Sequence, residues 1–483
     1  MYVSCKHRTS DLSEFFSHEN RKYPPSLSEN GNLRLPSNKA DLEKCLSNHL
    51  QSPVEERTAS PPTTCTIYDG AFMTQINCPQ NNSTFAEYFN LFCKKIVTSG
   101  LNSKASRIDL VFDRYFIETI KAVRIKRGDS SRRNVKPQNQ VPKVWGHFLK
   151  NSQNKEELFE MLAESITKYS SNVLVIATKG STAISNVRSE LDICRISPCD
   201  HEEADTRMFL HAHHASQAGH SRVLIRSRDT AVLVLGVHLF EQLDVEELWL
   251  AFGVGKHFRF IPIHELHACM NPSLVNGLTF FHAFTGCDSV SSFSGIGKTT
   301  AYNKAVKASD PILEAFRLLS AQPEELSEAT LAAIELFVIQ MYDSSYKKKT
   351  DINATRLRLV SRGKTIEKVP PTKEALRQHT KRAAFQAGYV WARSLEKDQH
   401  LPSYRQWGWT DDTTNSTVIP LWTVLPPASE TCKELIKCKC TGRCNNNCQC
   451  KKKELSCTHL CKCEGQCDVE QSVTTHQPMD IEP

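Results

Sequence analysis

The stretch RVLIRSRDTAVLVLG, residues 222–236, places an acidic residue, Asp229, between two short apolar runs. Both runs are rich in Val, Leu and Ile and have the length of a buried β-strand. We therefore expect one strand before Asp229 and another after it. An acidic side chain between two such strands points out of the edge of the sheet, where ligands gather in open α/β folds.

Similar apolar runs recur along the chain and alternate with amphipathic segments of helical spacing. The runs are TIYDGAF (66–72), RIDLVFD (107–113), NVLVIAT (172–178) and ELWLAFG (247–253). Helical patterns cover residues 203–217, 326–342 and 370–400. The alternation predicts an α/β fold with a mainly parallel sheet and helices on both faces.

Composition divides the 483-residue chain into five parts. Residues 1–60 are rich in Ser, Asn, Pro and charge, which predicts an irregular or disordered segment. The α/β domain is expected over residues 61–350, and a helical, Trp- and Pro-containing connector over residues 351–430. A cysteine-rich module follows at residues 431–468, and a polar tail without predicted structure at residues 469–483.

Composition also limits the class of protein. Hydrophobic residues make up 40% of the chain and charged residues 23%, as in an ordinary soluble protein. No apolar run approaches the roughly 18 residues that a membrane span needs, and the first residues lack the apolar core of a secretory signal. We therefore expect an intracellular protein that does not enter a membrane. The net charge of +7 permits a nucleic-acid partner without requiring one.

A basic run, IKAVRIKRGDSSRR at residues 120–133, follows the predicted strand that ends at Asp113. It contains one acidic residue, Asp129, and six basic ones: Lys121, Arg124, Lys126, Arg127, Arg132 and Arg133. Such a run is either a solvated surface or a nucleic-acid contact. The sequence alone favours neither.

Six acidic residues lie near the ends of predicted elements: Asp69, Asp113, Glu203, Asp205, Asp229 and Asp288. Carboxylate oxygens are the ligands that Mg²⁺ and Mn²⁺ prefer, and a two-metal site for phosphodiester cleavage holds its ions about 4 Å apart. Each acid also has a simpler explanation as a turn former, a helix N-cap or a charge favoured by a helix dipole. Glu203 and Asp205 do not share a helix face, so both reach one site only if the pair straddles the helix start.

The order and local context of these acids resemble the flap endonuclease branch of the PIN-like 5′-nucleases. The matching segments are LVFDR (110–114), EAD (203–205), SRDTAVLVLG (227–236) and TGCDSVSSFSGIG (285–297), within residues 65–310. The resemblance implies that the six acids hold two Mg²⁺ or Mn²⁺ ions, which activate water and stabilise the leaving oxygen. It also implies a catalytic role for Lys121 and Arg127, which match basic residues that steer the scissile phosphate.

The GIG turn at residues 295–297 resembles the helix-turn-helix element of that family. In the family, backbone N–H groups of this element and a bound cation grip the phosphates of duplex DNA. The resemblance therefore implies nucleic-acid contacts at this turn and in the basic run. The residues concerned are Gly295, Gly297, Lys298, Arg124 and Lys126.

The chain departs from the family at Ala231, which stands where an acidic ligand is expected in Asp229-Thr230-Ala231. The region between Asp113 and Glu203 also lacks the pattern of an arch that threads a flap. Two functions stay open as a result. One is a metal-dependent, structure-specific nuclease, and the other is a catalytically impaired protein of the same fold that binds DNA or chromatin.

Ten of the nineteen cysteines crowd between Cys432 and Cys467. Nine follow the spacing C-x-C-x3-C-x3-C-x-C-x6-C-x3-C-x-C-x3-C: Cys438, Cys440, Cys444, Cys448, Cys450, Cys457, Cys461, Cys463 and Cys467. In a reducing compartment this density predicts tetrahedral zinc sites with thiolate ligands. Nine thiolates satisfy three Zn²⁺ ions if three sulfurs bridge.

The cysteine spacing is similar to that of the CXC domain of the tesmin family, which contacts DNA. The resemblance implies DNA contacts for Lys451 and Lys452, although Asn447 replaces an aromatic residue of the family. Both resemblances imply a nuclear protein whose partner is DNA, with RNA left open. The sequence gives no indication of protein partners.

Overall fold

The computed structural model describes residues 12–38, 40–50, 57–115, 120, 131–187, 192–343, 351–412, 417–429, 438–441, 444–453, 457 and 461–463. The chain divides into two compact units. The α/β unit comprises Leu27–Tyr346 and Leu376–Trp422, and the terminal unit comprises Met1–Ser26, Lys347–Ala375 and Thr423–Pro483. The α/β unit thus takes in segments on both sides of the predicted domain at residues 61–350.

A seven-stranded sheet forms the centre of the α/β unit, with the strand order β6-β5-β4-β3-β7-β8-β9. Its strands are β3 (Cys65–Asp69), β4 (Arg107–Val111), β5 (Leu174–Lys179), β6 (Thr182–Ser185), β7 (Arg222–Arg226), β8 (Glu247–Phe252) and β9 (Arg259–Pro262). The inner strands pair in parallel, and the edge strands β6 and β9 pair antiparallel. The chain builds β4, β5 and β6 on one side of β3 and then crosses to β7 on the other. This change of direction creates a switch point at the C-terminal ends of β3 and β7, where ligands bind in such sheets.

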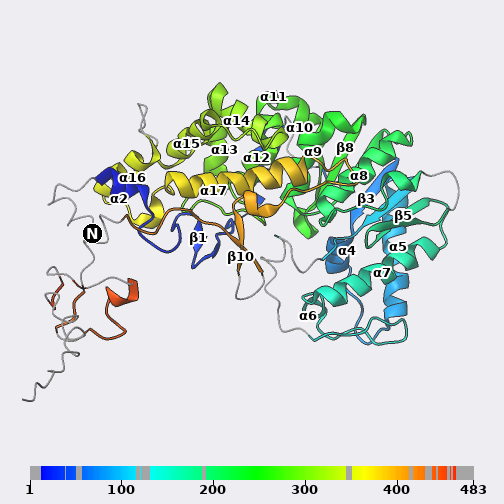
Figure 1. Cartoon of the computed structure of the whole chain (residues 1–483). Coiled ribbons are helices and arrows are strands. Elements are labelled where there is room, and N and C mark those ends of the chain that lie inside the picture. The colour runs from blue at the N-terminus through cyan, green and yellow to red at the C-terminus, as the bar shows by residue number, and fades with distance from the viewer. Residues whose placement is uncertain are drawn as a thin grey trace, which may run out of the picture. The chain divides into compact units, whose positions relative to one another are not determined.

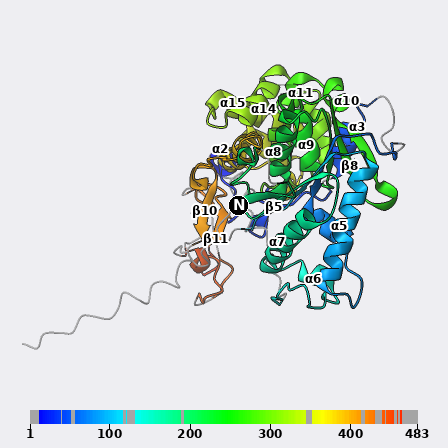
Figure 2. The same cartoon turned by 90° about the vertical axis from the view of Figure 1, so that its right-hand side faces the viewer.

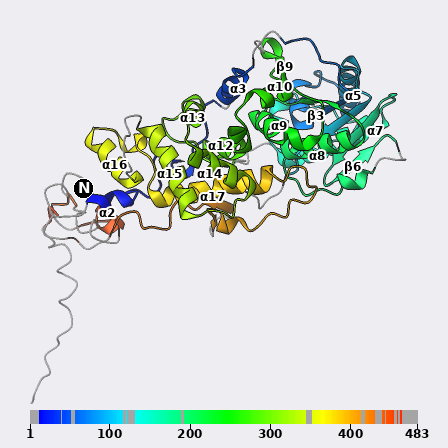
Figure 3. The same ribbon diagram turned by 90° about the horizontal axis from the view of Figure 1, so that it is seen from above.

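Helices cover both faces of this sheet (Figures 2 and 3). On one face, α5 (Phe85–Asn102) and α7 (Ser152–Lys168) pack with Leu110 and Val175 of the sheet in one apolar core. On the other face, α8 (Ala204–Gln217) is held by a buried polar network. Its His211 Nδ1 lies 2.6 Å from Asp109 Oδ2 of β4. The predicted α/β class, with a mainly parallel sheet and helices on both faces, is confirmed.

The run after Asp229 is a helix, α9 (Thr230–Leu243), and not the strand that the sequence predicts. Asp229 is its N-cap residue, and nearly every side chain from Thr230 to Val237 is buried. A helix that is buried on all sides has no polar face, so its sequence shows no helical periodicity. Composition alone therefore could not separate it from a buried strand.

A helical layer continues the α/β unit beyond the sheet (Figure 3). Phe281, Phe316 and Phe337 make edge or tilted ring contacts there, with centroids 5.0–6.4 Å apart. The helices of this layer are α10 (Ile263–Cys269), α11 (Pro272–Asn276), α12 (Leu278–Phe284), α13 (Lys298–Ala305), α14 (Asp310–Ala321) and α15 (Glu328–Tyr342). The helix predicted at residues 326–342 is confirmed by α15.

The helix predicted at residues 370–400 is present in part. An α-helix, α17 (Lys373–Ala384), continues into a π-helical turn, η6 (Phe385–Trp391). A short hairpin follows, made of β10 (Trp409–Asp412) and β11 (Thr417–Pro420). π-helical turns are rare and frequently lie at functional sites.

The described part of residues 1–60 is more ordered than its composition predicts. It contains α2 (Leu12–Ser17), a hairpin of β1 (Ser28–Glu29) and β2 (Asn32–Leu33), and α3 (Ala40–Ser47). Glu43 of α3 pairs with Arg259 of β9, and the backbone oxygen of Arg34 accepts from the N–H of Ser292 at 2.7 Å. These long-range contacts fold a polar segment onto the α/β unit, which local composition cannot show.

The terminal unit contains α2, α16 (Ile352–Ser361) and the cysteine cluster (Figure 1). The buried Glu19 joins its segments by accepting from the N–H of Thr372 at 2.7 Å and by pairing with Arg356 at 3.5 Å.

Two further short helices, α4 (Gly70–Ile76) and α6 (Trp145–Phe148), belong to the α/β unit. None of the helices within the described ranges is long and apolar enough to cross a membrane.

Candidate metal centres

Asp69 ends the central strand β3 and caps helix α4. Its Oδ1 accepts from the N–H of Phe72 at 2.9 Å, and its Oδ2 accepts from Ser227 Oγ at 3.1 Å. Ser227 follows β7, so this bond joins the ends of the two strands at the switch point. Asp69 is 9% exposed, and a backbone N–H and a serine hydroxyl hold its carboxylate in place.

Asp113 lies two residues beyond the end of β4. Its Oδ1 accepts a 2.9 Å hydrogen bond from the backbone N–H of Ala204, the first residue of α8. The N–H of Arg114 also donates to the backbone oxygen of Glu202 at 2.9 Å. These bonds place the start of α8 against the end of β4. Glu203 and the helical Asp205 therefore lie at the same sheet edge as Asp113.

Asp229 caps α9 through a 2.9 Å hydrogen bond from the N–H of Ala231 to its Oδ1. Its own N–H donates to Ser227 Oγ at 3.2 Å. Ser227 thus contacts both Asp69 and Asp229. The sequence did not single out this serine, because a serine after a strand has no distinguishing pattern.

One pocket unites four of the predicted acids from three separate places in the chain: Glu203, Asp205, Asp229 and Asp288. Ala231 also lines it, so the position that lacks the expected acid faces the same space as the acids that are present. The remaining lining residues are His282, Cys287, Ser289, Gln386 and Trp391. Glu203 and Asp205 both reach the pocket because they straddle the start of α8.

Asp69 and Asp113 act on the pocket electrostatically. Burial raises the pKa of Asp205 well above its usual range, and repulsion from Asp229, Glu203, Asp69 and Asp113 raises it further. Burial, with repulsion from Asp113 and Asp229, raises the pKa of Asp69 to about 7 despite its hydrogen bonds. The other acids therefore lie close enough to Asp205 and Asp69 to disfavour the charged forms of these two.

Oxygen donors of this kind fit hard divalent cations such as Mg²⁺ and Mn²⁺. A cation among the carboxylates would relieve both the repulsion and the loss of solvation. In the portion of the chain that is described, the only groups of three or more ligand atoms within 4.8 Å of one another are cysteines. No three carboxylate oxygens of different residues within these ranges therefore lie as close together as the sulfur atoms of the cysteine groups do.

The loop that carries Asp288 is held in place from several sides. Gly286 has a φ of +111°, and a Cβ there would lie 2.7 Å from Cβ of Ser292, so only glycine suits this turn. Ser289 Oγ donates to Gln386 Oε1 at 2.6 Å, which joins the loop to the π-helical turn. Sequence reasoning missed Gln386 and Trp391, because they lie about 100 residues beyond Asp288 in a segment that carries no motif.

The GIG turn leaves open space at its glycines. Gly295 has a φ of +76°, a conformation that favours glycine, whereas Gly297 has an ordinary φ of −81°. A Cβ at either glycine would meet no heavy atom of the described structure within 4 Å. Gly297 precedes α13 as its N-cap residue and provides no side-chain cap. The first turn of α13 is therefore accessible from the glycine side.

Lys298 lies elsewhere than the resemblance implies. It is 3% exposed, and its Nζ donates to the backbone oxygen of His282 at 2.7 Å and to Thr285 Oγ1 at 2.9 Å. Burial lowers the pKa of its amine to about 7. An ammonium enclosed in this way cannot reach a phosphate, so the expected nucleic-acid contact is wrong for this residue. Its structural role is to tie α13 to α12.

The basic residues predicted to steer or bind nucleic acid lie outside the described residues. These are Lys121, Arg124, Lys126 and Arg127. Arg132, from the same run, is described and pairs with Glu157 of α7 at 2.8 Å. This ion pair with Glu157 gives Arg132 a structural role.

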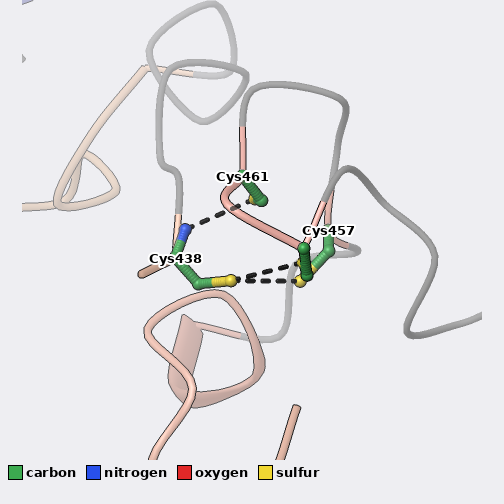
Figure 4. Close-up of side chains that lie close together, drawn as sticks. Cys438, Cys457 and Cys461 are labelled. Carbon is green, nitrogen blue, oxygen red and sulfur yellow. Dashed lines mark hydrogen bonds between the residues drawn. The ribbon is translucent and has the colours of Figure 1, made fainter. Parts of the chain in front are cut away.

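The cysteine cluster brings eight of the nine predicted thiols together, while Cys467 lies outside the described residues. Sulfur–sulfur distances include 3.7 Å from Cys438 to Cys444, 3.8 Å from Cys438 to Cys457 and 3.5 Å from Cys450 to Cys461. Figure 4 shows Cys457 and Cys461 turned toward Cys438. The edge of a zinc–sulfur tetrahedron with bonds of about 2.3 Å is roughly 3.8 Å. The cluster could therefore hold zinc.

Three groups of four cysteines have their sulfur atoms within 4.8 Å of one another. They are Cys438, Cys457, Cys461 and Cys463; Cys438, Cys448, Cys450 and Cys457; and Cys438, Cys440, Cys444 and Cys448. Cys438 belongs to all three groups, and Cys448 and Cys457 each belong to two. Lys451 and Lys452 are exposed in the short 3₁₀ turn beside the cluster, η8 (Lys451–Lys453).

Comparisons with known proteins find similarity among solved structures only. No family model matches the chain, and no curated protein matches it. Among solved structures, the chain is similar to a bacteriophage T5 flap endonuclease, determined as a pseudo-enzyme–product complex with DNA and metal ions. The sequence identity is 12% and the TM-score 0.32, over 68% of this chain and 96% of that one.

Proposed function

We propose that the α/β unit is a PIN-like, flap-endonuclease-like domain that hydrolyses phosphodiester bonds in DNA with two Mg²⁺ or Mn²⁺ ions. The observation that supports this most is the shared pocket of Glu203, Asp205, Asp229 and Asp288. These acids come from three separate places in the chain. Bringing them together costs free energy through repulsion, which bound cations offset.

Each acid would have its own role in such a site. Asp205, Asp229 and Asp288 would hold the cations on the pocket side, and Asp69 and Asp113 would support them from the ends of β3 and β4. When bound, a pair of cations supplies a nucleophilic hydroxide at neutral pH and stabilises the leaving oxygen. Glu203, at the N-cap of α8, would orient the attacking water or a cation.

The GIG turn would position the nucleic acid. The start of α13 is uncapped by a side chain and open at Gly295 and Gly297, and backbone N–H groups at a helix start bind phosphate oxygens. The basic residues Lys121 and Arg127 would approach the scissile phosphate, with Arg124 and Lys126 beside them. RNA carries the same phosphates, so this arrangement does not by itself select DNA.

A second candidate function is nucleic-acid binding without cleavage. Ala231 supports it, because its methyl group faces the pocket where a carboxylate would complete the metal ligands. Two-metal chemistry depends on both ions, so a weakened second site reduces the rate of cleavage. The DNA- or chromatin-binding surface would remain.

We infer that the cysteine cluster is a CXC-type module with three Zn²⁺ ions, in which Cys467 provides the ninth thiolate. Cys438, Cys448 and Cys457 are the bridging candidates, since each belongs to more than one group of four sulfurs. Lys451 and Lys452 would contact DNA phosphates. A nuclease-like unit and a DNA-binding zinc module in one chain fit a nuclear protein.

Cleavage of a 5′-flap DNA duplex by the full chain with Mn²⁺ tests the nuclease proposal. The matched variants are Asp205→Asn and Asp229→Asn, because asparagine keeps the helix cap at position 229 while it removes the charge. We expect cleavage by the unaltered chain and a loss of at least a hundredfold in both variants. DNA binding without cleavage, or equal cleavage by the variants, supports the binding function instead.

A further inference from the structure

His282 forms a wall of the carboxylate pocket that the proposed chemistry does not yet use. It lies on α12, is 2% exposed and lines the pocket with Asp229 and Asp288. Its ring stacks on that of Trp391, with centroids 5.5 Å apart and an angle of 21° between the planes. The ring is therefore fixed in orientation by packing on one face.

The buried Lys298 determines which nitrogen of His282 carries the proton. Lys298 Nζ contacts three groups: the backbone oxygen of His282, Thr285 Oγ1 and, at 3.2 Å, His282 Nδ1. Below about pH 7, where the amine of Lys298 is protonated, these contacts match the three N–H donors of an ammonium, which has no acceptor. His282 Nδ1 is then the acceptor, and the proton of the neutral ring lies on Nε2. Burial, with the charge of Lys298, lowers the pKa of His282 well below its usual range and keeps the ring neutral.

A neutral imidazole in this tautomer donates a hydrogen bond and cannot ligate a cation. Nδ1 is occupied by Lys298, and Nε2 carries a proton instead of a lone pair. Trp391 also lines the pocket, and its buried Nε1–H finds no acceptor within the described ranges. Donors beside a carboxylate pocket suit an anionic ligand that arrives together with the cations, such as a phosphate group.

We propose that His282 contacts the substrate by donating its Nε2–H to a non-bridging phosphate oxygen of nucleic acid bound in this pocket. The inference rests on the proposed function, because it needs a phosphate beside the bound cations. Lys298 is then a positioning residue, which acts by fixing the tautomer of His282. Fixing the tautomer of His282 is therefore the role of the buried Lys298, in place of the phosphate contact that the resemblance implied.

Two substitutions test the roles of the two ring nitrogens of His282 separately. The amide of His282→Gln reaches the place of Nε2 and provides an N–H donor there. The shorter amide of His282→Asn can accept from Lys298 near the place of Nδ1 but provides no donor at Nε2. Calorimetry of the full chain measures Mn²⁺ binding first, and then binding of thymidine 5′-monophosphate to the Mn²⁺-loaded protein.

We expect Mn²⁺ affinity within twofold of the original in both variants. Nucleotide affinity should fall roughly tenfold in His282→Asn and stay close to the original in His282→Gln, since one hydrogen bond to a charged group is lost. Equal nucleotide affinities, or a loss of Mn²⁺ affinity in both, would overturn the inference. Should His282→Asn fail to fold, His282→Phe, which keeps the ring stack, takes its place. Absence of Mn²⁺ binding in the unaltered chain refutes the proposed function itself.

Discussion

The backbone N–H of Ala231 donates a 2.9 Å hydrogen bond to Oδ1 of Asp229. Ala231 is therefore the second residue of helix α9, and its methyl group lines the carboxylate pocket. The first turn of a helix carries a partial positive charge that favours acidic side chains. The position is thus suited to a carboxylate in both location and local electrostatics.

Ala231→Asp is expected to strengthen Mn²⁺ binding and to increase flap cleavage by about tenfold or more, because a carboxylate at this place adds a metal ligand. Calorimetry and the cleavage assay measure the two effects. Ala231→Asn, which has the same shape without the charge, is the control and should give neither gain. If aspartate and asparagine behave alike, Ala231 does not occupy a ligand position.

The raised pKa of Asp69 predicts that the stability of the folded chain depends on pH. Its pKa in the folded chain is raised to about 7 from an ordinary value of 3.8. The folded state therefore binds this proton more tightly than the unfolded state does, and the stability it gives is present at low pH and lost as the pH rises through about 7. Asp69→Asn, whose Oδ1 can still accept from the N–H of Phe72, removes this loss.

In EDTA, Asp69→Asn should therefore melt several degrees above the unaltered chain at about pH 8, and the difference should shrink as the pH falls and disappear only below about pH 4. Thermal unfolding followed by circular dichroism measures it. Added Mn²⁺ should reverse the order at the higher pH, since only the carboxylate binds the cation. A difference in melting temperature that does not change with pH would contradict the raised pKa.

The candidate site was partly predictable because its acids occupy positions that local sequence defines. Asp69 follows a strand, and Glu203 and Asp205 flank a helix start, so their common edge follows from a parallel sheet. Gln386 and Trp391 could not be predicted, because they reach the pocket through the packing of a distant helix. The burial of Lys298 was also hidden, since a lysine after a glycine turn looks solvent-exposed in sequence.

The fold was likewise predictable only in part. The strands β3, β4, β5, β7 and β8 were predictable from short apolar runs, whereas α9 was not, because burial on all sides removes its periodicity. The antiparallel edge strand β9 and the helix α3 are joined by an ion pair between Glu43 and Arg259, more than 200 residues apart. A contact between residues so far apart cannot be predicted from the local sequence.

Cys438 belongs to all three groups of four sulfurs, and Cys440 belongs to one. Cys438→Ser should therefore disrupt the whole cluster, whereas Cys440→Ser should release about one zinc ion of three, because a metal site of this size supplies the folding energy of its segment. Elemental analysis and a thiol-release assay with a colorimetric zinc indicator measure the zinc content of each variant. The serine variants are matched in size and charge, so they differ only in position.

Equal zinc content in the two variants would show that the sulfur groups do not describe the metal sites. A zinc content near zero in the unaltered chain would remove the zinc assignment altogether. The α/β unit provides an internal reference, since its melting temperature should not depend on the substitution at either cysteine.

Lys298→Met should destabilise the chain without changing the number of DNA phosphates that the protein neutralises. The substitution leaves the carbonyl of His282 and Thr285 Oγ1 without their buried donor, at about 1–3 kcal/mol for each group, partly offset by removal of a buried charge. The melting temperature should therefore fall by several degrees. The salt dependence of DNA binding should stay the same, since its slope reports the number of phosphates neutralised. Lys307→Met, at an exposed lysine shortly after the same helix, is the matched control and should leave the melting temperature unchanged. A Lys298→Met chain that keeps its stability but loses about one unit of salt slope would show that this lysine reaches a phosphate after all.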